Sequence, residues 1–393
     1  MQTQLKLFDV IIVGAGPAGT AAAYRALENK LSVLLLDRTD IPADKPCAGG
    51  LTLKTLALMP YSVASVIEHV TTGLDIGIEN GQATRLERFD RGADICAFAV
   101  RAKFDALNFK KTIEKGAQFV KIRRLDQIKQ SADHVELTCG EQTYRAKYLI
   151  GADGANSKVR RMTCPNNGFH RGFAVEGLVP YDALQSRPYA EFLLGVVQSG
   201  YGWVFPKGDH ANVGIYTNRD DVPLSKEQLR HYSRTRLNTD VLDHIKGYPL
   251  GFGGEHFWQV EGRVVLVGDA GGYAEPLLGE GLHNAVLSGQ CAAQAIVDIE
   301  EGATRRSLKA HYKNLSTPVR KDVKRCRDIA HQIIYPRLNG MGGKVLMHPV
   351  SRYVLLQGFA AGITTHKITN RFMLAGLMRP QHVSSLQEFH TPL

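Results

Sequence analysis

The sequence predicts an α/β protein, and three observations carry that prediction. Residues 10–13 form a continuous apolar run, which suits a strand buried in a parallel sheet. A helix-forming stretch covers residues 20–27, and a second apolar run covers residues 31–36. Strand, helix and strand in this order are typical of a βαβ unit, whose two strands lie side by side in one sheet.

The turn that joins the first strand to the helix reads Gly14-Ala-Gly16-Pro-Ala-Gly19. Gly14 permits a tight turn, Gly16 lets a pyrophosphate approach the backbone, and Gly19 lets the helix pack closely on the sheet. The helix N-terminus offers free N–H groups and a positive dipole end. The second strand ends at Asp37, where a carboxylate can accept hydrogen bonds from ribose hydroxyls. The pattern predicts a Rossmann-like dinucleotide site, without choosing between NAD and FAD.

Two later segments favour FAD. Residues 146–161 read as a strand that runs into Gly-Ala-Asp-Gly, and residues 261–296 read as a strand, a glycine-rich turn and a long helix. We expect Asp269, in that turn, to reach a ribityl hydroxyl or a phosphate-side group of an extended cofactor. The N-terminus of the helix after Gly281 would favour the anionic edge of a reduced flavin.

These three motifs, in order between residues 8 and 300, resemble the FAD-dependent family of para-hydroxybenzoate-hydroxylase type. Residues 100–105, VRAKFD, match the Arg-x-x-Phe-Asp element of that family. The resemblance implies that Arg101 contacts FAD, whereas a surface ion pair is the ordinary alternative. No second GxGxxG turn follows a strand, so we expect no separate NAD(P)H domain. Electrons would then come from transiently docked NAD(P)H, or from a protein or quinol donor.

Two further stretches resemble the geranylgeranyl reductase branch of that family. Residues 44–56, DKPCAGGLTLKTL, match its loop beside the flavin, although the loop here reads Cys-Ala-Gly-Gly instead of Cys-Gly-Gly. Residues 201–206, YGWVFP, match its Tyr-x-Trp-x-Phe-Pro strand, which lines the substrate cavity, although Gln198 stands where a proline is usual. The resemblance implies catalytic roles for Cys47, Tyr201 and Trp203. It implies, with the glycine turns, this set of cofactor-binding residues: Gly14, Gly16, Pro17, Ala18, Gly19, Asp37, Arg38, Ala48, Gly49, Arg101, Asp269, Pro276, Gly279, Gly281 and Leu282.

The residue types leave two interpretations open at the candidate catalytic positions. Tyr201, Trp203 and Phe205 share one face of a strand, which is either core packing or a cavity wall. Buried Tyr and Trp also need hydrogen-bond partners, which favours the wall. Cys47 is either a small buried hydrophobe or a functional thiol, and the flexible Ala-Gly-Gly that follows it favours function.

We expect a discontinuous architecture of three parts. The FAD-binding part would take residues 1–75, 100–165 and 260–300, a β-rich substrate part residues 76–99 and 166–259, and a helical cap residues 301–393. Within the second part, residues 203–216 read as a hairpin.

Charge and cysteine content exclude several functions. The net charge is +10, and residues 301–393 hold 15 Lys and Arg against four Asp and Glu. This basic segment suits a solvated helix face, an acidic substrate or peripheral contact with an anionic membrane surface; no nucleic-acid-binding motif accompanies it. The six cysteines form no CxxC pair, so neither a metal site nor a disulfide framework is expected. Without a signal peptide or a long apolar run, we expect a cytoplasmic location, with the inner face of the membrane as its alternative.

Three functions remain open. The first is an FAD-dependent oxidoreductase that reduces carbon–carbon double bonds of an isoprenoid or another lipophilic substrate. The second is a flavin-dependent monooxygenase that hydroxylates an aromatic ring or a protein side chain. The third is a flavin-holding protein whose partner matters more than its reaction.

Overall fold

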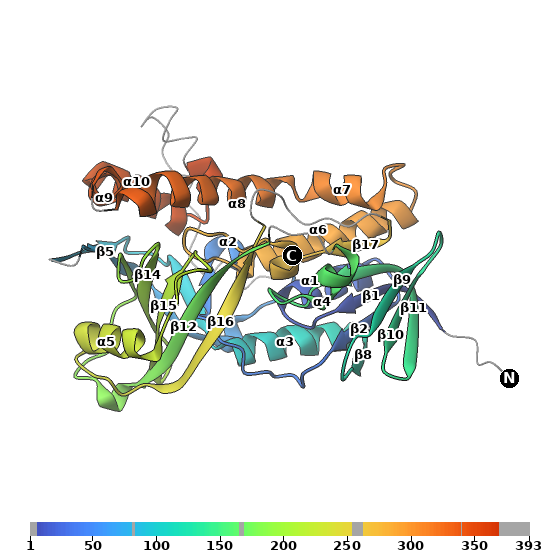
Figure 1. Cartoon of the computed structure of the whole chain (residues 1–393), viewed down its shortest axis with the longest axis horizontal. Coiled ribbons are helices and arrows are strands. Elements are labelled where there is room, and N and C mark those ends of the chain that lie inside the picture. The colour runs from blue at the N-terminus through green and yellow to red at the C-terminus, as the bar shows by residue number, and fades with distance from the viewer. Residues whose placement is uncertain (1–5, 81–82, 165–168, 254–261, 339, 369–393) are drawn as a thin grey trace.

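A computed structural model describes residues 6–80, 83–164, 169–253, 262–338 and 340–368. Two seven-stranded sheets lie side by side, and a row of helices crosses above both of them (Figure 1). The mixed α/β fold predicted from the sequence is confirmed.

The first sheet contains the predicted βαβ unit. Its strand order is β8-β2-β1-β11-β10-β9, and β17 pairs with β11. The neighbours β8, β2, β1, β11 and β17 run parallel, whereas β10 and β9 extend the sheet as antiparallel strands. The strands are β1 (Leu7–Val13), β2 (Val33–Asp37), β8 (Gln118–Lys121), β9 (Gln127–Gln130), β10 (Val135–Cys139), β11 (Gln142–Gly151) and β17 (Val264–Leu266).

Helices cover this sheet because its apolar strands present buried residues on both faces. Val10 and Ile12 of β1 face the cluster that includes α1 and α6, whereas Ile11 and Val13 face the opposite cluster. The helix α1 packs tightly on α6, since a Cβ on Gly289 would lie 2.2 Å from the carbonyl oxygen of Ala18. The helices of this part are α1 (Pro17–Glu28), α3 (Arg101–Glu114), α4 (Lys158–Thr163) and α6 (Leu282–Glu300).

The second sheet has the order β16-β12-β15-β14-β13-β5-β6 and is antiparallel except between β13 and β5. The predicted hairpin is confirmed as β14 and β15, with Phe205 opposite Asn212. The helix α5 (Lys226–Leu237) starts at a capping box between Ser225 and Gln228, and it covers one face. The strands are β5 (Gly73–Glu79), β6 (Thr84–Asp90), β12 (His170–Pro180), β13 (Glu191–Leu194), β14 (Gly200–Pro206), β15 (His210–Thr217) and β16 (Asp243–Phe252).

A small third sheet, β3-β7-β4, joins the two large ones. It consists of β3 (Gly50–Thr52), β4 (Ile67–Thr71) and β7 (Cys96–Ala99), and the short helix α2 (Leu53–Leu56) follows β3. Residues 96–99, which the expected boundaries place in the substrate part, form β7 and pair with β3 and β4. The start of β3 lies against the aromatic strand, since a Cβ on Gly50 would be 3.6 Å from Phe205 Cε2.

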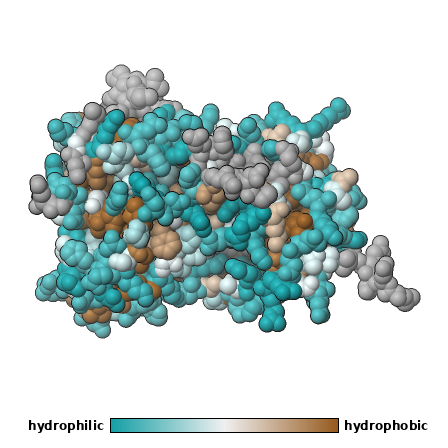
Figure 2. Space-filling view, in the orientation of Figure 1, coloured by the Kyte–Doolittle hydropathy of each residue, from teal (hydrophilic) through white to brown (hydrophobic). Residues whose placement is uncertain are grey.

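The C-terminal segment is helical as far as it is described. In Figure 1, α7 and α8 run along the top of the molecule from the first sheet toward the second, where α9 and α10 lie. Their bounds are α7 (Leu308–Leu315), α8 (Thr317–Ile329), α9 (Met341–Met347) and α10 (Pro349–Ala360). None of the helices in the described ranges is both long enough and apolar enough to cross a bilayer. Figure 2 shows a mostly hydrophilic face, with its hydrophobic residues in separate patches.

Candidate active site

A cavity of about 780 Å³ extends from the end of β1 to the C-terminal helices. Of the residues that the sequence singled out for cofactor or catalysis, all line this cavity except Gly19 and Pro276. Gly19 packs inside the turn, where an added Cβ would lie 1.8 Å from the carbonyl oxygen of Gly14. Pro276 lies behind the wall, and its carbonyl oxygen accepts a hydrogen bond from the Tyr216 hydroxyl at 3.1 Å. The structure thus brings residues from distant parts of the chain to one space.

The polar end of the cavity fits a dinucleotide. Gly14 has a φ of +108°, and a Cβ there would lie 2.3 Å from the carbonyl oxygen of Ala152, so only glycine suits this turn. A Cβ on Gly16 would instead meet only Lys45 Nζ, at 3.9 Å, which leaves room for a phosphate beside the backbone and a cation near it. The helix that starts after Gly16 has no side-chain cap, so its first N–H groups remain available to an anion.

Asp37 stands at the end of β2, as the sequence predicted. One carboxylate oxygen accepts the Ala15 N–H at 2.7 Å, and the other accepts the Thr39 N–H and hydroxyl at 2.9 and 2.8 Å. Burial works to raise the pKa of Asp37, but these donors and the positive charge of Lys45 hold it below its usual value. Asp37 is therefore ionised at neutral pH and can accept further hydrogen bonds from a ribose.

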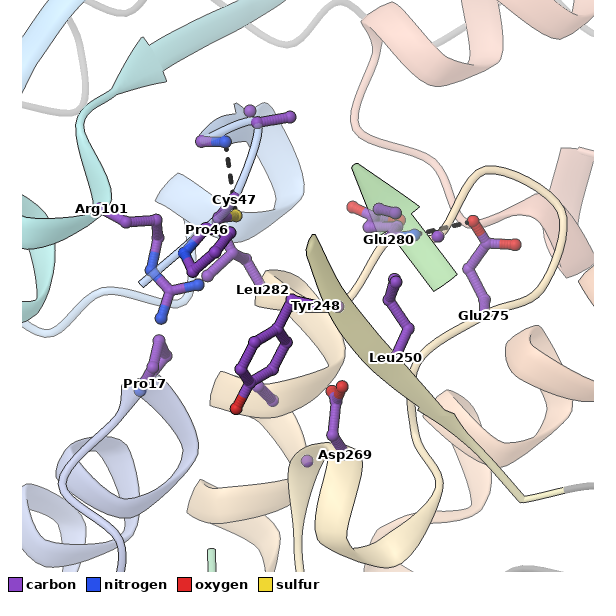
Figure 3. A pocket seen from close by; sticks show the side chains of 18 of the residues that line it. Pro17, Pro46, Cys47, Arg101, Tyr248, Leu250, Asp269, Glu275, Glu280 and Leu282 are labelled. Atoms are coloured by element: carbon purple, nitrogen blue, oxygen red, sulfur yellow. Dashed lines mark hydrogen bonds between the residues drawn. The ribbon is translucent and has the colours of Figure 1, made fainter. Parts of the chain in front are cut away.

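The middle of the cavity collects the groups expected beside a flavin (Figure 3). The side chain of Arg101 extends from the start of α3 toward Pro17, and Asp269 lies beyond the ring of Tyr248 in this view. Asp269 is half-buried and accepts the Gly251 N–H at 3.0 Å. Burial raises its pKa, against the opposing effects of that hydrogen bond and of Arg101 and Arg160.

The N-terminus of α6 points at the same space. Its cap, Gly281, provides no side chain, and a Cβ there would meet only an Asp269 carboxylate oxygen, at 3.6 Å. The preceding loop, residues 275–281, is held by the buried carboxylate of Glu275, which accepts N–H groups of Leu277, Leu278 and Glu280 at 2.7, 2.7 and 3.0 Å. A flavin therefore fits between a rigid loop, an uncapped helix and Arg101.

The Arg101 side chain is 13% exposed, and its guanidinium donates two hydrogen bonds to the buried Asp105, at 3.0 and 2.8 Å. Burial alone lowers the pKa of Arg101, but the Asp105 carboxylate and the Cys47 side chain more than offset this effect. This ion pair is not on the surface, since the two side chains are 13% and 4% exposed and Arg101 lines the cavity; contact of Arg101 with FAD stays a prediction.

The far end of the cavity is apolar. Tyr201, Trp203 and Phe205 are each at most 6% exposed, and all three line it. Both polar tips have partners: the Tyr201 hydroxyl donates to the Leu278 carbonyl oxygen at 2.5 Å, and Trp203 Nε1 donates to Asn212 Oδ1 at 2.7 Å. The remaining walls come from the second sheet and the C-terminal helices: Leu74, Ile76, Phe192, Leu194, Cys326, Ile329, Ile334, Leu346, Leu356, Ile363 and Ile368.

Several residues that shape this site were missed at the sequence level. Buried Lys54 pairs with Glu280 at 2.6 Å and lies 3.8 Å from Asp322 of α8. Two further residues were missed. Glu176 could have been noticed as a single acid inside an apolar strand, and Lys207 as the cation directly after the aromatic strand. Within the described ranges, no three His, Cys, Asp or Glu side chains group to hold a metal ion.

Comparisons with known proteins agree with this geometry. Residues 8–169 match a family model described as FAD binding domain. The digeranylgeranylglycerophospholipid reductase of Methanosarcina acetivorans is 30% identical over 307 residues, which cover 74% of this chain and 75% of that protein. An uncharacterized protein of Methanosarcina barkeri is 32% identical over 313 residues, covering 79% and 80%.

Solved structures share the fold. A geranylgeranyl bacteriochlorophyll reductase-like protein from Thermoplasma acidophilum superposes with a TM-score of 0.71 at 21% identity, covering 84% of this chain and 89% of that one. Flavin-dependent halogenases and an anhydrotetracycline hydroxylase also share it, with TM-scores of 0.62 to 0.66. The shared fold does not distinguish reductases from halogenases and hydroxylases, whereas the sequence relatives with an assigned activity are named as reductases.

Proposed function

Because the chain belongs to the geranylgeranyl reductase family of FAD-dependent oxidoreductases, we propose that it reduces carbon–carbon double bonds of an isoprenoid or similar lipophilic substrate. The observation that carries the proposal is the apolar chamber that continues from the cofactor end of the cavity. Burying an alkyl chain there is favourable by about 25 cal/mol per Å² of apolar surface. A long hydrocarbon therefore gains far more from this chamber than a small polar substrate.

The proposed FAD site uses the residues that the sequence singled out. Gly14, Gly16 and the start of α1 hold the pyrophosphate, and Asp37 holds the ribose. Arg101 and the N-terminus of α6 would lie beside the ring system, where their positive charge favours its anionic reduced form, and Asp269 would accept a hydrogen bond from a ribityl hydroxyl. When bound, FAD supplies the two electrons that the double bond accepts.

The chain's own residues then hold the substrate and deliver a proton. Tyr201, Trp203 and Phe205 orient the alkene with their aromatic faces, and the apolar lining excludes water. We assign the proton to the Cys47 side chain, since the Tyr201 hydroxyl is committed to a backbone carbonyl. NAD(P)H or another donor would dock transiently, and this part of the proposal rests on the sequence alone.

Anaerobic incubation with chemically reduced flavin tests the function directly. Prenyl diphosphates, prenylated lipids and prenylquinones are offered in turn, and mass spectrometry follows a gain of two hydrogens per double bond. No gain with any of the three classes would falsify the proposal. Formation of an oxygenated product only when dioxygen is admitted would instead support the monooxygenase, whose fold this chain shares.

The cap carries apolar residues on its outside as well. Val350 and Tyr353 of α10 are 60% and 58% exposed, and Ile333 is 40% exposed. Leu356 of α10 and Leu346 of the neighbouring helix α9 line the chamber. We propose that these exposed residues rest on the inner face of the cytoplasmic membrane, from which a lipid enters. Co-sedimentation with anionic vesicles should fall when Val350 and Tyr353 are both replaced by Ser; unchanged binding would contradict this placement.

A further inference from the structure

The loop that carries Cys47, residues 45–49, is gripped from the second sheet by two buried charged side chains. Oε1 of Glu176, on β12, accepts the Cys47 backbone N–H at 2.8 Å. Nζ of Lys207, directly after β14, donates to the Ala48 carbonyl oxygen at 2.6 Å and to the Ala99 carbonyl oxygen at 3.2 Å. One acid and one base thus bind backbone groups of two neighbouring residues of this loop, Cys47 and Ala48.

Both side chains are buried at a substantial cost. Lys207 is 2% exposed and Glu176 is 9% exposed. Burial lowers the pKa of Lys207 to about 8 and raises the pKa of Glu176. A charge kept in such a place needs strong hydrogen bonds to offset its lost hydration, and here those bonds go to the cysteine loop. The loop packs closely against Lys207, because a Cβ on Gly49 would lie 2.8 Å from Lys207 Nζ.

The same acid reaches the aromatic wall. Trp203 Nε1 donates to Asn212 Oδ1 at 2.7 Å, and the Asn212 side chain lies next to the Glu176 carboxylate, whose pKa it lowers. Gly214 lies opposite Trp203 and makes room for the indole, since a Cβ there would lie 2.0 Å from the ring. Asn212 and Glu176 therefore stand between the indole of the wall and the backbone of Cys47, each with a hydrogen bond to one of them.

We propose that Glu176 and Lys207 are positioning residues that fix the cysteine loop relative to Trp203. The proposal rests on the proposed function only where it treats Trp203 as a wall for the substrate. Substrate binding depends on the apolar lining, which neither residue provides. The approach of the Cys47 thiol to a bound substrate depends on the loop, so the rate of the chemical step should respond more than substrate affinity.

Hydrogen–deuterium exchange tests, without any substrate, whether Glu176 and Lys207 hold the cysteine loop. In Glu176→Ala, the amide of Cys47 loses its acceptor, and we expect exchange in a peptide covering residues 44–52 to rise by roughly tenfold or more. Glu176→Gln keeps an acceptor oxygen and should retain most of the protection. Glu191→Ala is the matched control: Glu191 is a buried acid of the same sheet that binds Tyr232 and Arg236, away from the loop. Equal exchange in the Glu176→Ala and Glu191→Ala variants would overturn the proposal.

Lys207→Met provides an independent variant if Glu176→Ala does not fold. It keeps the apolar stem and deletes the ammonium, so we expect faster exchange in the same peptide. With an isoprenoid substrate, both variants should lower kcat by about tenfold and change KM by less than about threefold, and Glu176→Gln should recover part of kcat. A raised KM with unchanged kcat would overturn the positioning role. If the wild type reduces no isoprenoid, the proposed function fails. The exchange measurement still shows whether Glu176 and Lys207 hold the cysteine loop in place.

Discussion

The buried pair of Arg101 and Asp105 allows cofactor binding to be separated from folding. The two side chains are 13% and 4% exposed and share two hydrogen bonds. Arg101→Met removes the cation and leaves a buried carboxylate without its partner. Breaking a buried pair from one side costs about 3–5 kcal/mol, and we expect the free energy of unfolding to fall by this amount.

A second substitution in the same chain isolates the cofactor. Asp105→Leu removes the stranded carboxylate, and replacing both members of a buried ion pair by apolar residues is often nearly neutral. The double variant should therefore recover most of the stability lost by Arg101→Met. If Arg101 contacts FAD, the double variant still lacks one charged hydrogen-bond donor. We expect it to bind FAD about 10–100-fold more weakly than the wild type.

Two measurements check this prediction. Urea unfolding of the apoprotein reports stability, and quenching of flavin fluorescence on titration reports FAD affinity. The control is the pair of Arg88 and Asp75, which share two hydrogen bonds of 2.7 Å and do not line the cavity. Its double replacement should leave FAD affinity unchanged. Wild-type affinity in the Arg101 and Asp105 double variant would refute a cofactor role for Arg101.

Three further predictions follow from single residues. Burial raises the pKa of Glu275 from 4.5 to about 7, so its contribution to stability is complete below pH 4.5 and is lost as the pH rises through 7. Urea unfolding should show that the free energy of unfolding of the wild type falls by about 3 kcal/mol relative to Glu275→Gln between pH 4.5 and a pH above 7. A difference between the two proteins that does not change with pH contradicts this. Tyr201→Phe should lower stability by about 1–3 kcal/mol and change kcat by less than about threefold; a far larger fall in kcat would make its hydroxyl the proton donor. Gly19→Ala should yield protein without FAD, seen as a low ratio of flavin to protein absorbance, and full occupancy would count against the tight turn.

Much of the cofactor end could be predicted from the sequence because it is built from local segments. The turn at Gly14–Gly19, the acid at Asp37 and the start of α6 each lie within one strand–loop–helix unit. Their apolar runs and glycines are therefore visible in a short window. The same holds for the β14–β15 hairpin, whose register follows from alternating aromatic residues and a short turn.

The rest depends on contacts between distant segments. Glu176 is 129 residues from Cys47, and Lys207 is 159 residues from Ala48, so no local pattern could pair them. The strand β7 shows the same limit: a four-residue apolar strand pairs equally well with several neighbours until tertiary contacts choose one. The pairing of Arg101 with Asp105, four residues apart on one helix face, was available from spacing alone.

The chamber has a consequence for the order in which the protein matures. Its walls come from Leu74, Phe192 and Leu346, so they are complete only after nearly all of the described chain has been made. The cofactor end needs nothing beyond α6. During vectorial synthesis the two large sheets and α6 can therefore form first, while the side of the chamber that the later helices line is still open to solvent. Entry of the flavin before α8 and α10 close over it is the simplest loading route, and the last helices would then seal a holoenzyme.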